Sequence, residues 1–145
     1  MKARNTGHVI NIGSVAGREP YIGGSIYCAT KHAVRAFTGT LLRELVETQV
    51  RVTEIQPGMV ETEFSIVRYR GDKDAAEKVY QSFAPRMFSI ICVVQEGAKL
   101  HSVTAGDVAE EIVWAASRPP HVNIAEVFLM PTNQATPWLV HRDDK

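Results

Sequence analysis

The 145-residue sequence lacks the features that mark a protein for a membrane, for nucleic acid or for secretion. It has 16 Lys+Arg against 16 Asp+Glu, so no positive excess favours nucleic acid or anionic lipid. No apolar run reaches the roughly 18 residues that a membrane-spanning helix needs. The basic start, Met1–Asn5, is not followed by a long apolar region, which argues against a secretory signal. We therefore expect a soluble, cytoplasmic protein without a membrane or nucleic-acid partner.

Cysteine is scarce, and its pattern excludes two further classes. Cys28 and Cys92 are the only cysteines, and neither belongs to a C-x-x-C or Cys/His cluster. A disulfide framework and a zinc site are therefore not expected, and we predict two reduced, buried thiols and no metal. Cys28 lies beside Tyr27, but no partner base is placed to make it a nucleophile. The length fits one domain over residues 1–145.

The first part of the chain predicts a strand, a helix and a second strand. His8–Ser14 is short, apolar and β-branched, as in buried strands of parallel sheets. Apolar residues at helical spacing predict a long helix from Ser25 to about Thr48. Val50–Ile55 alternates with period two and stops at Pro57-Gly58. This βαβ unit favours a right-handed crossover and a parallel sheet. The apolar face of the helix is expected to comprise Ala29, Ala33, Val34, Phe37, Leu41, Leu45 and Val46.

The second half of the chain predicts a helix, a strand and a tail. Thr104–Ser117 has a helical apolar face, with Thr104 as the expected cap and Asp107 at the third position. Glu126–Met130 is predicted as the last strand, and Pro131–Lys145 is a polar, proline-punctuated tail. All elements together predict an α/β fold.

The segment between the two halves is harder to interpret. Gly58–Asp72 is expected to be a functional loop at a strand's carboxyl end, and Asp74–Gln81 a short helix. Arg86–Val103 contains the apolar, uncharged run Phe88–Val94. Either this run is a buried strand, or it is an exposed, aggregation-prone insertion.

One group of polar residues predicts chemistry. Tyr27 and Lys31 are four apart, so a helix places them on one face, and Ser14 lies thirteen residues before Tyr27 at a strand end. An ordinary phenol has a pKa of about 10, and a neighbouring ammonium favours the phenolate, which suits a general acid or base. A serine hydroxyl can hold a carbonyl or alkoxide oxygen beside the phenol. The alternative is that Tyr27 and Lys31 merely occupy an exposed helix turn.

The same residues resemble the short-chain dehydrogenase/reductase family. Ser14, Tyr27 and Lys31 match its catalytic serine, tyrosine and lysine in type, order and spacing, and Pro57–Thr62 resembles its Pro-Gly-x-Val-x-Thr segment. The resemblance implies hydride transfer between NAD(P) and an alcohol or carbonyl carbon. Tyr27 would exchange the proton, Lys31 would assist it and bind the nicotinamide ribose, and Ser14 would orient the substrate oxygen. The implied cofactor contacts are Tyr27, Lys31, Pro57, Gly58, Val60 and Thr62.

Longer segments are similar to one branch of the family. Gly58–Gly71, His121–Gln134 and Val140–Arg142 resemble NADP-dependent 3-hydroxy acid dehydrogenases that act on serine, allo-threonine and related hydroxy acids. The resemblance implies NADP as cofactor, with NAD as a possible substitute, and a small hydroxy acid as substrate. It also implies a homo-oligomer, because such enzymes are usually tetramers.

The sequence also departs from the family. It has no G-x-x-x-G-x-G turn to seat a pyrophosphate at a helix N-terminus. The expected fold is therefore the C-terminal portion of a Rossmann-type doubly wound parallel sheet, without the N-terminal glycine-rich half. Two alternatives to an enzyme follow. One is a truncated, non-catalytic fragment that cannot bind the dinucleotide or acts only by association with full-length relatives, and the other is a nucleotide-binding regulatory module.

Residues 86–103 are the second departure. Relatives pass from a segment like Lys78–Gln81 to the Thr104 helix in only a few residues. We expect an insertion here, from a retained intron or a mis-joined exon. A spliced transcript that still encodes Phe88–Val94 would contradict this expectation.

Several other residues are expected to have ordinary roles. His32 is predicted on the helix surface, and Phe37 and Trp114 in the core. Arg68 and Arg70 either face a phosphate or carboxylate, or lie in a solvated loop.

Overall fold

The computed structural model describes residues 1–63, 67, 70–74 and 102–140, and its central feature is a parallel three-stranded sheet. Its strands are β1 (Gly7–Ile12), β2 (Val50–Pro57) and β5 (Glu126–Leu129), in the order β1-β2-β5. The two long helices are α1 (Ser25–Glu44) and α4 (Ala105–Ala116). The 3-10 helices Lys2–Arg4 and Val15–Gly17 flank β1, and β3 (Val60–Glu61) pairs in parallel with β4 (Val103–Thr104).

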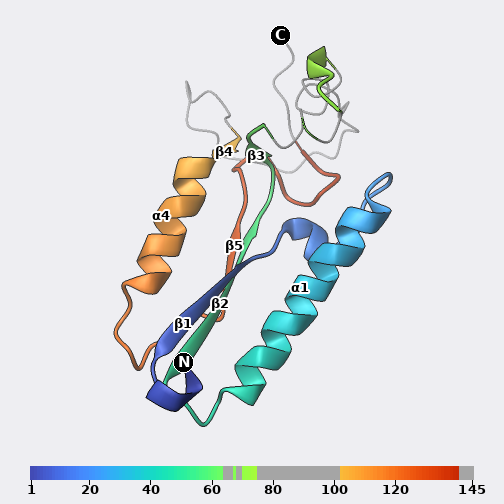
Figure 1. The fold of residues 1–145 in the computed structure, drawn as a ribbon. Helices are drawn as coiled ribbons and strands as arrows, with labels where there is room; N and C mark the ends of the chain where they lie inside the picture. Colours follow the sequence, from blue (N-terminus) through green and yellow to red (C-terminus); the bar gives the residue numbers. More distant parts are fainter. Residues whose placement is uncertain (64–66, 68–69, 75–101, 141–145) are drawn as a thin grey trace.

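β2 is the middle strand and is covered on both faces. Val52, Thr53 and Glu54 are consecutive and at most 1% exposed, although successive side chains of a strand point to opposite faces. On one face Val52 packs with Leu45 of the α1 end. On the other face, Arg51 donates hydrogen bonds at 2.9 to 3.3 Å to three backbone carbonyls at and just after the C-terminal end of α4. Figure 1 accordingly shows α1 and α4 flanking the strands.

The predicted βαβ unit is present, with several boundaries different. β1 is Gly7–Ile12 rather than His8–Ser14, and β2 continues past Ile55 to Pro57. α1 begins at Ser25 as expected but ends at Glu44 rather than near Thr48. The Thr48 hydroxyl donates to the Leu45 carbonyl at 2.7 Å and accepts from the Val50 amide at 3.2 Å. These bonds turn the chain from the helix into β2, because threonine side chains offer the backbone an alternative to helical pairing.

The predicted apolar face of α1 lies only partly in the core. Leu45 is buried, but Phe37 is 60% exposed and Val46 is 79% exposed. The apolar stripe is wider than the surface that the described strands offer to it, so its outer part stays in solvent. The expectation for Trp114 is also wrong, since it is 44% exposed and its ring lies under the Arg118 guanidinium at 4.9 Å.

The start of α4 matches its prediction closely. The Thr104 hydroxyl accepts from the Asp107 amide at 3.2 Å, and Asp107 Oδ2 accepts from the Thr104 amide at 2.7 Å. This reciprocal pair is the capping box that a threonine followed three residues later by an acidic residue predicts. The same bonds lower the pKa of the Asp107 carboxyl.

Other predictions meet the structure only in part. β5 ends at Leu129, one residue before the predicted Met130. Cys28 is a free, buried thiol as expected. Cys92, Phe88–Val94 and the predicted helix after Asp74 lie outside the described residues. Of Arg86–Val103, only Ser102 and Val103 are described, and Val103 opens β4.

The described ranges contain neither a membrane-spanning helix nor a cluster of metal ligands. Within them, no helix is long and apolar enough to cross a bilayer. In the same part of the chain, no group of three or more histidine, cysteine, aspartate or glutamate side chains is placed to hold a metal ion.

Candidate active site

Ser14 lies just beyond the carboxyl end of β1. The ladder continues to Gly13, whose amide donates to the Ile55 carbonyl at 2.7 Å. Ser14 is 7% exposed, and its Oγ accepts from the Ala16 amide at 3.1 Å as the cap of the Val15–Gly17 turn. A hydroxyl that accepts one bond keeps its hydrogen to donate. Ser14 can therefore donate to an oxygen placed at this end of the sheet.

Lys31 ties helix α1 to the same strand end. Its Nζ donates to the Ile12 carbonyl at 3.0 Å and lies 5.7 Å from the centre of the Tyr27 ring. Both side chains are half-buried. Burial lowers the pKa of the Lys31 ammonium, and the Glu54 carboxylate raises it to a smaller extent. The predicted Tyr27–Lys31 face of the helix is thus turned toward the end of β1.

A glycine brings the Ser14 turn against the helix. A Cβ on Gly17 would lie 2.7 Å from the Lys31 carbonyl oxygen, so the turn packs directly on the backbone of α1. The carboxyl end of β1 and the first half of α1 therefore meet, as Figure 1 shows. Ser14 follows the end of a strand, and Tyr27 and Lys31 both lie on helix α1, as the sequence predicted.

The Pro57–Thr62 segment leaves the carboxyl end of β2. Pro57 is buried at the last position of β2, and the Gly58 amide donates to the Leu129 carbonyl at 2.7 Å. The Met59 amide donates to Gln134 Oε1 at 2.7 Å. Because β1 and β2 are parallel, this segment lies at the same end of the sheet as Ser14. Open α/β sheets bind ligands at this end.

A polar layer, which was not predicted from the sequence, lies between the sheet and α1. Glu54 and Gln56 are 1% and 0% exposed. Arg18 donates to Gln56 Oε1 and pairs with Glu126, which stands opposite Glu54 on β5. Burial raises the pKa of the Glu54 carboxyl, and Arg35 and Arg18 lower it to a lesser degree. Glu54 Oε1 has no hydrogen-bond partner among the described residues.

Two aromatic residues near Tyr27 were also missed. The Tyr21 ring lies 6.5 Å from the Tyr27 ring, and the Trp138 ring meets Tyr21 edge-on at 6.1 Å. Trp138 lies more than one hundred residues after Tyr27. No local spacing in the sequence could have connected them.

Of the remaining polar candidates, His32 and Arg70 do not join this site. His32 is exposed, and its Nδ1 bonds to the Cys28 carbonyl at 2.8 Å, in agreement with a surface role. Arg70 is exposed in a turn, and Arg68 lies outside the described residues.

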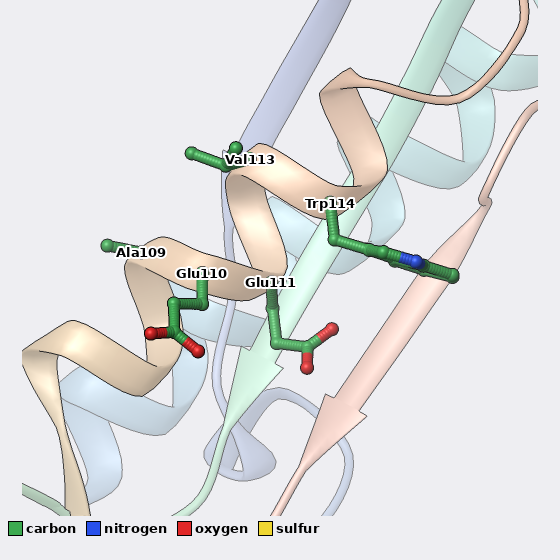
Figure 2. A pocket seen from close by; sticks show the side chains of 5 residues that line it. All are labelled: Ala109, Glu110, Glu111, Val113 and Trp114. Atoms are coloured by element: carbon green, nitrogen blue, oxygen red, sulfur yellow. The ribbon is translucent and has the colours of Figure 1, made fainter.

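A surface depression lies elsewhere, on α4. It is lined by Ala109, Glu110, Glu111, Val113 and Trp114, which Figure 2 shows projecting from one helix in different directions. None of the predicted site residues lines it, and no group of polar side chains converges in it. We therefore place the candidate site at the strand ends and not in this depression.

The fold and the arrangement of the site residues agree with the known proteins that this chain resembles. Residues 1–74 match the short chain dehydrogenase family, and the protein belongs to that family. A structure described as the closed form of serine dehydrogenase complexed with NADP+ superimposes with a TM-score of 0.77 at 44% identity, over 97% of this chain and 51% of that one. The predicted fold class, part of a Rossmann-type parallel sheet, is confirmed.

Curated relatives carry related names. An NADP-dependent 3-hydroxy acid dehydrogenase of Schizosaccharomyces pombe is 40% identical over 140 residues, 97% of this chain and 48% of the relative. The Escherichia coli NADP-dependent 3-hydroxy acid dehydrogenase YdfG is 44% identical over 144 residues, 98% of this chain and 51% of the relative. A serine 3-dehydrogenase of Agrobacterium fabrum is 39% identical over 91% of this chain. The chain spans about half the length of these relatives.

Proposed function

We propose that this chain supplies the acid–base part of an NADP-dependent oxidoreductase. The reaction is hydride transfer between NADP and the 3-hydroxyl or 3-oxo carbon of a small hydroxy acid such as serine or allo-threonine. The observation that carries the proposal is the bond from Lys31 Nζ to the Ile12 carbonyl, which holds the Tyr27–Lys31 face at the strand end that Ser14 follows. The names of the relatives support the substrate class.

Each site residue has one role in this proposal. The Ser14 hydroxyl donates a hydrogen bond to the substrate oxygen and holds it near Tyr27. In the oxidation direction Tyr27 Oη takes the proton of the 3-hydroxyl group, and in the reduction direction it returns that proton to the oxygen. The Lys31 ammonium, 5.7 Å from the Tyr27 ring, stabilises the phenolate in between.

The residues present suit one half of the cofactor. Lys31 and Tyr27 offer a cation and a hydroxyl to a ribose, and the backbone around Pro57, Gly58, Val60 and Thr62 lies at the same strand ends. NADP supplies the hydride acceptor or donor when bound. The pyrophosphate is different, because the sequence has no G-x-x-x-G-x-G turn to receive it.

A second copy of the chain is part of the proposal. Ile26 and Phe37 on α1 are 78% and 60% exposed. Apolar side chains that stay in solvent along one helix favour burial against a partner. We accordingly propose a homo-oligomer.

A non-catalytic role is the second candidate. Within the described part of the chain, β1 pairs with β2 alone and leaves its other edge open, and the chain spans about half of its relatives. An open edge accepts another strand. Such a protein would bind dinucleotide poorly and act only through association with full-length relatives.

One comparison tests both candidates. The 145-residue chain and a version extended by upstream coding sequence are assayed for NADP reduction with serine or allo-threonine and for NADPH oxidation with a 3-oxo acid. We expect turnover only in the extended version. Turnover by the 145-residue chain alone would contradict the non-catalytic candidate, and an inert extended version would contradict the oxidoreductase.

A further inference from the structure

The turn from Gln134 to Val140 closes on itself after β5. Gln134 and Val140 form an antiparallel bridge, and the Ala135 amide donates to the Leu139 carbonyl at 2.9 Å. The Thr136 hydroxyl accepts from the amides of Trp138 and Leu139 at 3.1 and 3.0 Å. Figure 1 shows the chain after β5 running across the carboxyl ends of the strands, the end that also holds the start of α1.

Gln134 connects this turn to the backbone of the Pro57–Thr62 segment. Its side chain is 7% exposed, and both ends of its amide are bonded. Oε1 accepts from the Met59 amide at 2.7 Å, and Nε2 donates to the Thr136 carbonyl at 3.2 Å. A planar amide held at both ends has one orientation, so it fixes the position of the Met59 amide.

Gly58 makes this contact possible. A Cβ at Gly58 would lie 2.5 Å from Gln134 Oε1 and 2.6 Å from Met130 Sδ. The side chain of Gln134 thus occupies the space that any larger residue at position 58 would need. The close contact between Gly58 and Gln134 therefore depends on glycine at position 58.

Trp138 connects the same turn to the other side of the site. Its ring meets Tyr21 edge-on at 6.1 Å, and Tyr21 lies 6.5 Å from Tyr27. The Tyr21 ring packs on the backbone of Gly24, where a Cβ would lie 2.5 Å from the ring. The three rings form a continuous row that begins on the turn and ends at the phenol.

We propose that the turn Gln134–Val140 is a positioning element of the site: Gln134 fixes the Pro57–Thr62 segment through the Met59 amide, and Trp138 fixes Tyr21 beside Tyr27. Gln134 is a positioning residue for the cofactor side, and Trp138 is one for the hydroxy acid side. The assignment of the two sides rests on the proposed function, whereas the contacts themselves do not.

The first test needs no activity. Amide hydrogen exchange is measured by NMR on the 145-residue chain for Met59 and for Gly58, whose amide bonds to Leu129 instead. In Gln134→Met, which keeps the length but loses the acceptor, Met59 should exchange about tenfold faster while Gly58 is unchanged. Gln134→Glu keeps an acceptor oxygen and should preserve most of the protection. Unchanged exchange at Met59 in Gln134→Met, or an unprotected Met59 amide in the unmodified chain, would overturn the proposal.

The second test measures the activity of the extended version. Gln134→Met should raise KM for NADP about tenfold with KM for the hydroxy acid unchanged, and Trp138→Ala should do the reverse. Thr132→Ala, an exposed substitution just before the turn, is the matched control and should change neither value. If both turn variants behave like Thr132→Ala while Tyr27→Phe abolishes turnover, the positioning role is wrong and the proposed function stands. If the unmodified extended version is inert, the proposed function is wrong. The exchange measurement alone then decides whether Gln134 holds the Met59 amide.

Discussion

The ammonium of Lys31 reaches across from helix α1 to the carbonyl of Ile12 at 3.0 Å. Ile12 is the last residue of β1, and Ser14 follows it by two positions. One side chain therefore joins the helix that carries Tyr27 to the strand that presents Ser14. A bond between a cation and a carbonyl is stronger than one between two neutral groups.

The first prediction concerns this bond. In the extended version, Lys31→Met should lower kcat by about 100-fold, because it removes both the cation beside Tyr27 and the tie to Ile12. Lys31→Arg keeps the charge and should retain part of the rate. Steady-state kinetics measures both variants. A Lys31→Met variant with more than half of the original kcat would contradict the role given to Lys31.

The second prediction concerns the buried carboxyl of Glu54. Burial raises its pKa, so the folded state favours the protonated form more than the unfolded state does. The stability that this provides is present at low pH and is lost as pH rises through the raised pKa. Glu54→Gln should therefore increase the free energy of unfolding at pH 7 and leave it nearly unchanged near pH 4, close to the ordinary glutamate pKa of about 4.3.

Urea unfolding at the two pH values measures this difference. Glu61→Gln, at an exposed position, is the matched control and should change stability at neither pH. An equal effect of Glu54→Gln at both pH values would show that packing, and not ionisation, determines how this substitution changes the free energy of unfolding.

The third prediction compares two glycines. A Cβ at Gly17 would lie 2.7 Å from the Lys31 carbonyl oxygen, so Gly17→Ala should destabilise the fold by about 1–3 kcal/mol. Gly39 lies inside α1, where a Cβ would meet only the flexible end of Arg43 at 3.3 Å. Gly39→Ala should stabilise by roughly 0.5–1 kcal/mol, because alanine is the better helix former. Thermal unfolding of both variants checks the opposite signs. The same sign in both would contradict the close packing at Gly17.

The fourth prediction concerns the cap of α4. Thr104→Ala removes the hydroxyl that caps the helix and should cost about 1 kcal/mol, while Thr104→Ser should cost little. The bonds from Thr104 lower the pKa of Asp107, so their contribution is present above the ordinary aspartate pKa and is lost as pH falls through the lowered one. Denaturant unfolding at neutral and at acid pH measures this loss. A Thr104→Ala cost that is the same at both pH values would contradict a role for the ionised Asp107.

Local patterns predicted the elements that carry the site. The βαβ unit follows from period-two and helical spacing over His8–Ile55, and the capping box follows from Thr104 and Asp107 alone. The contacts that reach across the chain could not be predicted this way. Gln134 and Trp138 are far from Met59 and Tyr21 in sequence, and nothing in their neighbours indicates the pairing.

Which side chains are buried could also not be predicted from the sequence alone. Glu54 and Gln56 are polar residues in a strand that alternates, yet both are buried because α1 covers their face and Arg18 and Arg35 supply compensating charge. The opposite error occurred at Phe37, which has the right spacing for a core residue but lies on the part of α1 that the described strands do not cover. Spacing identifies a face, and only the packing partner decides whether that face is buried.

The proton-exchange role of Tyr27 is the central claim, and one measurement tests it most directly. NADP reduction with serine or allo-threonine is compared between the extended version and its Tyr27→Phe variant, which removes one oxygen and keeps the ring. The account predicts a fall in kcat of at least about 100-fold, with the fold judged intact by circular dichroism. A Tyr27→Phe variant that turns over within twofold of the unmodified protein would contradict it.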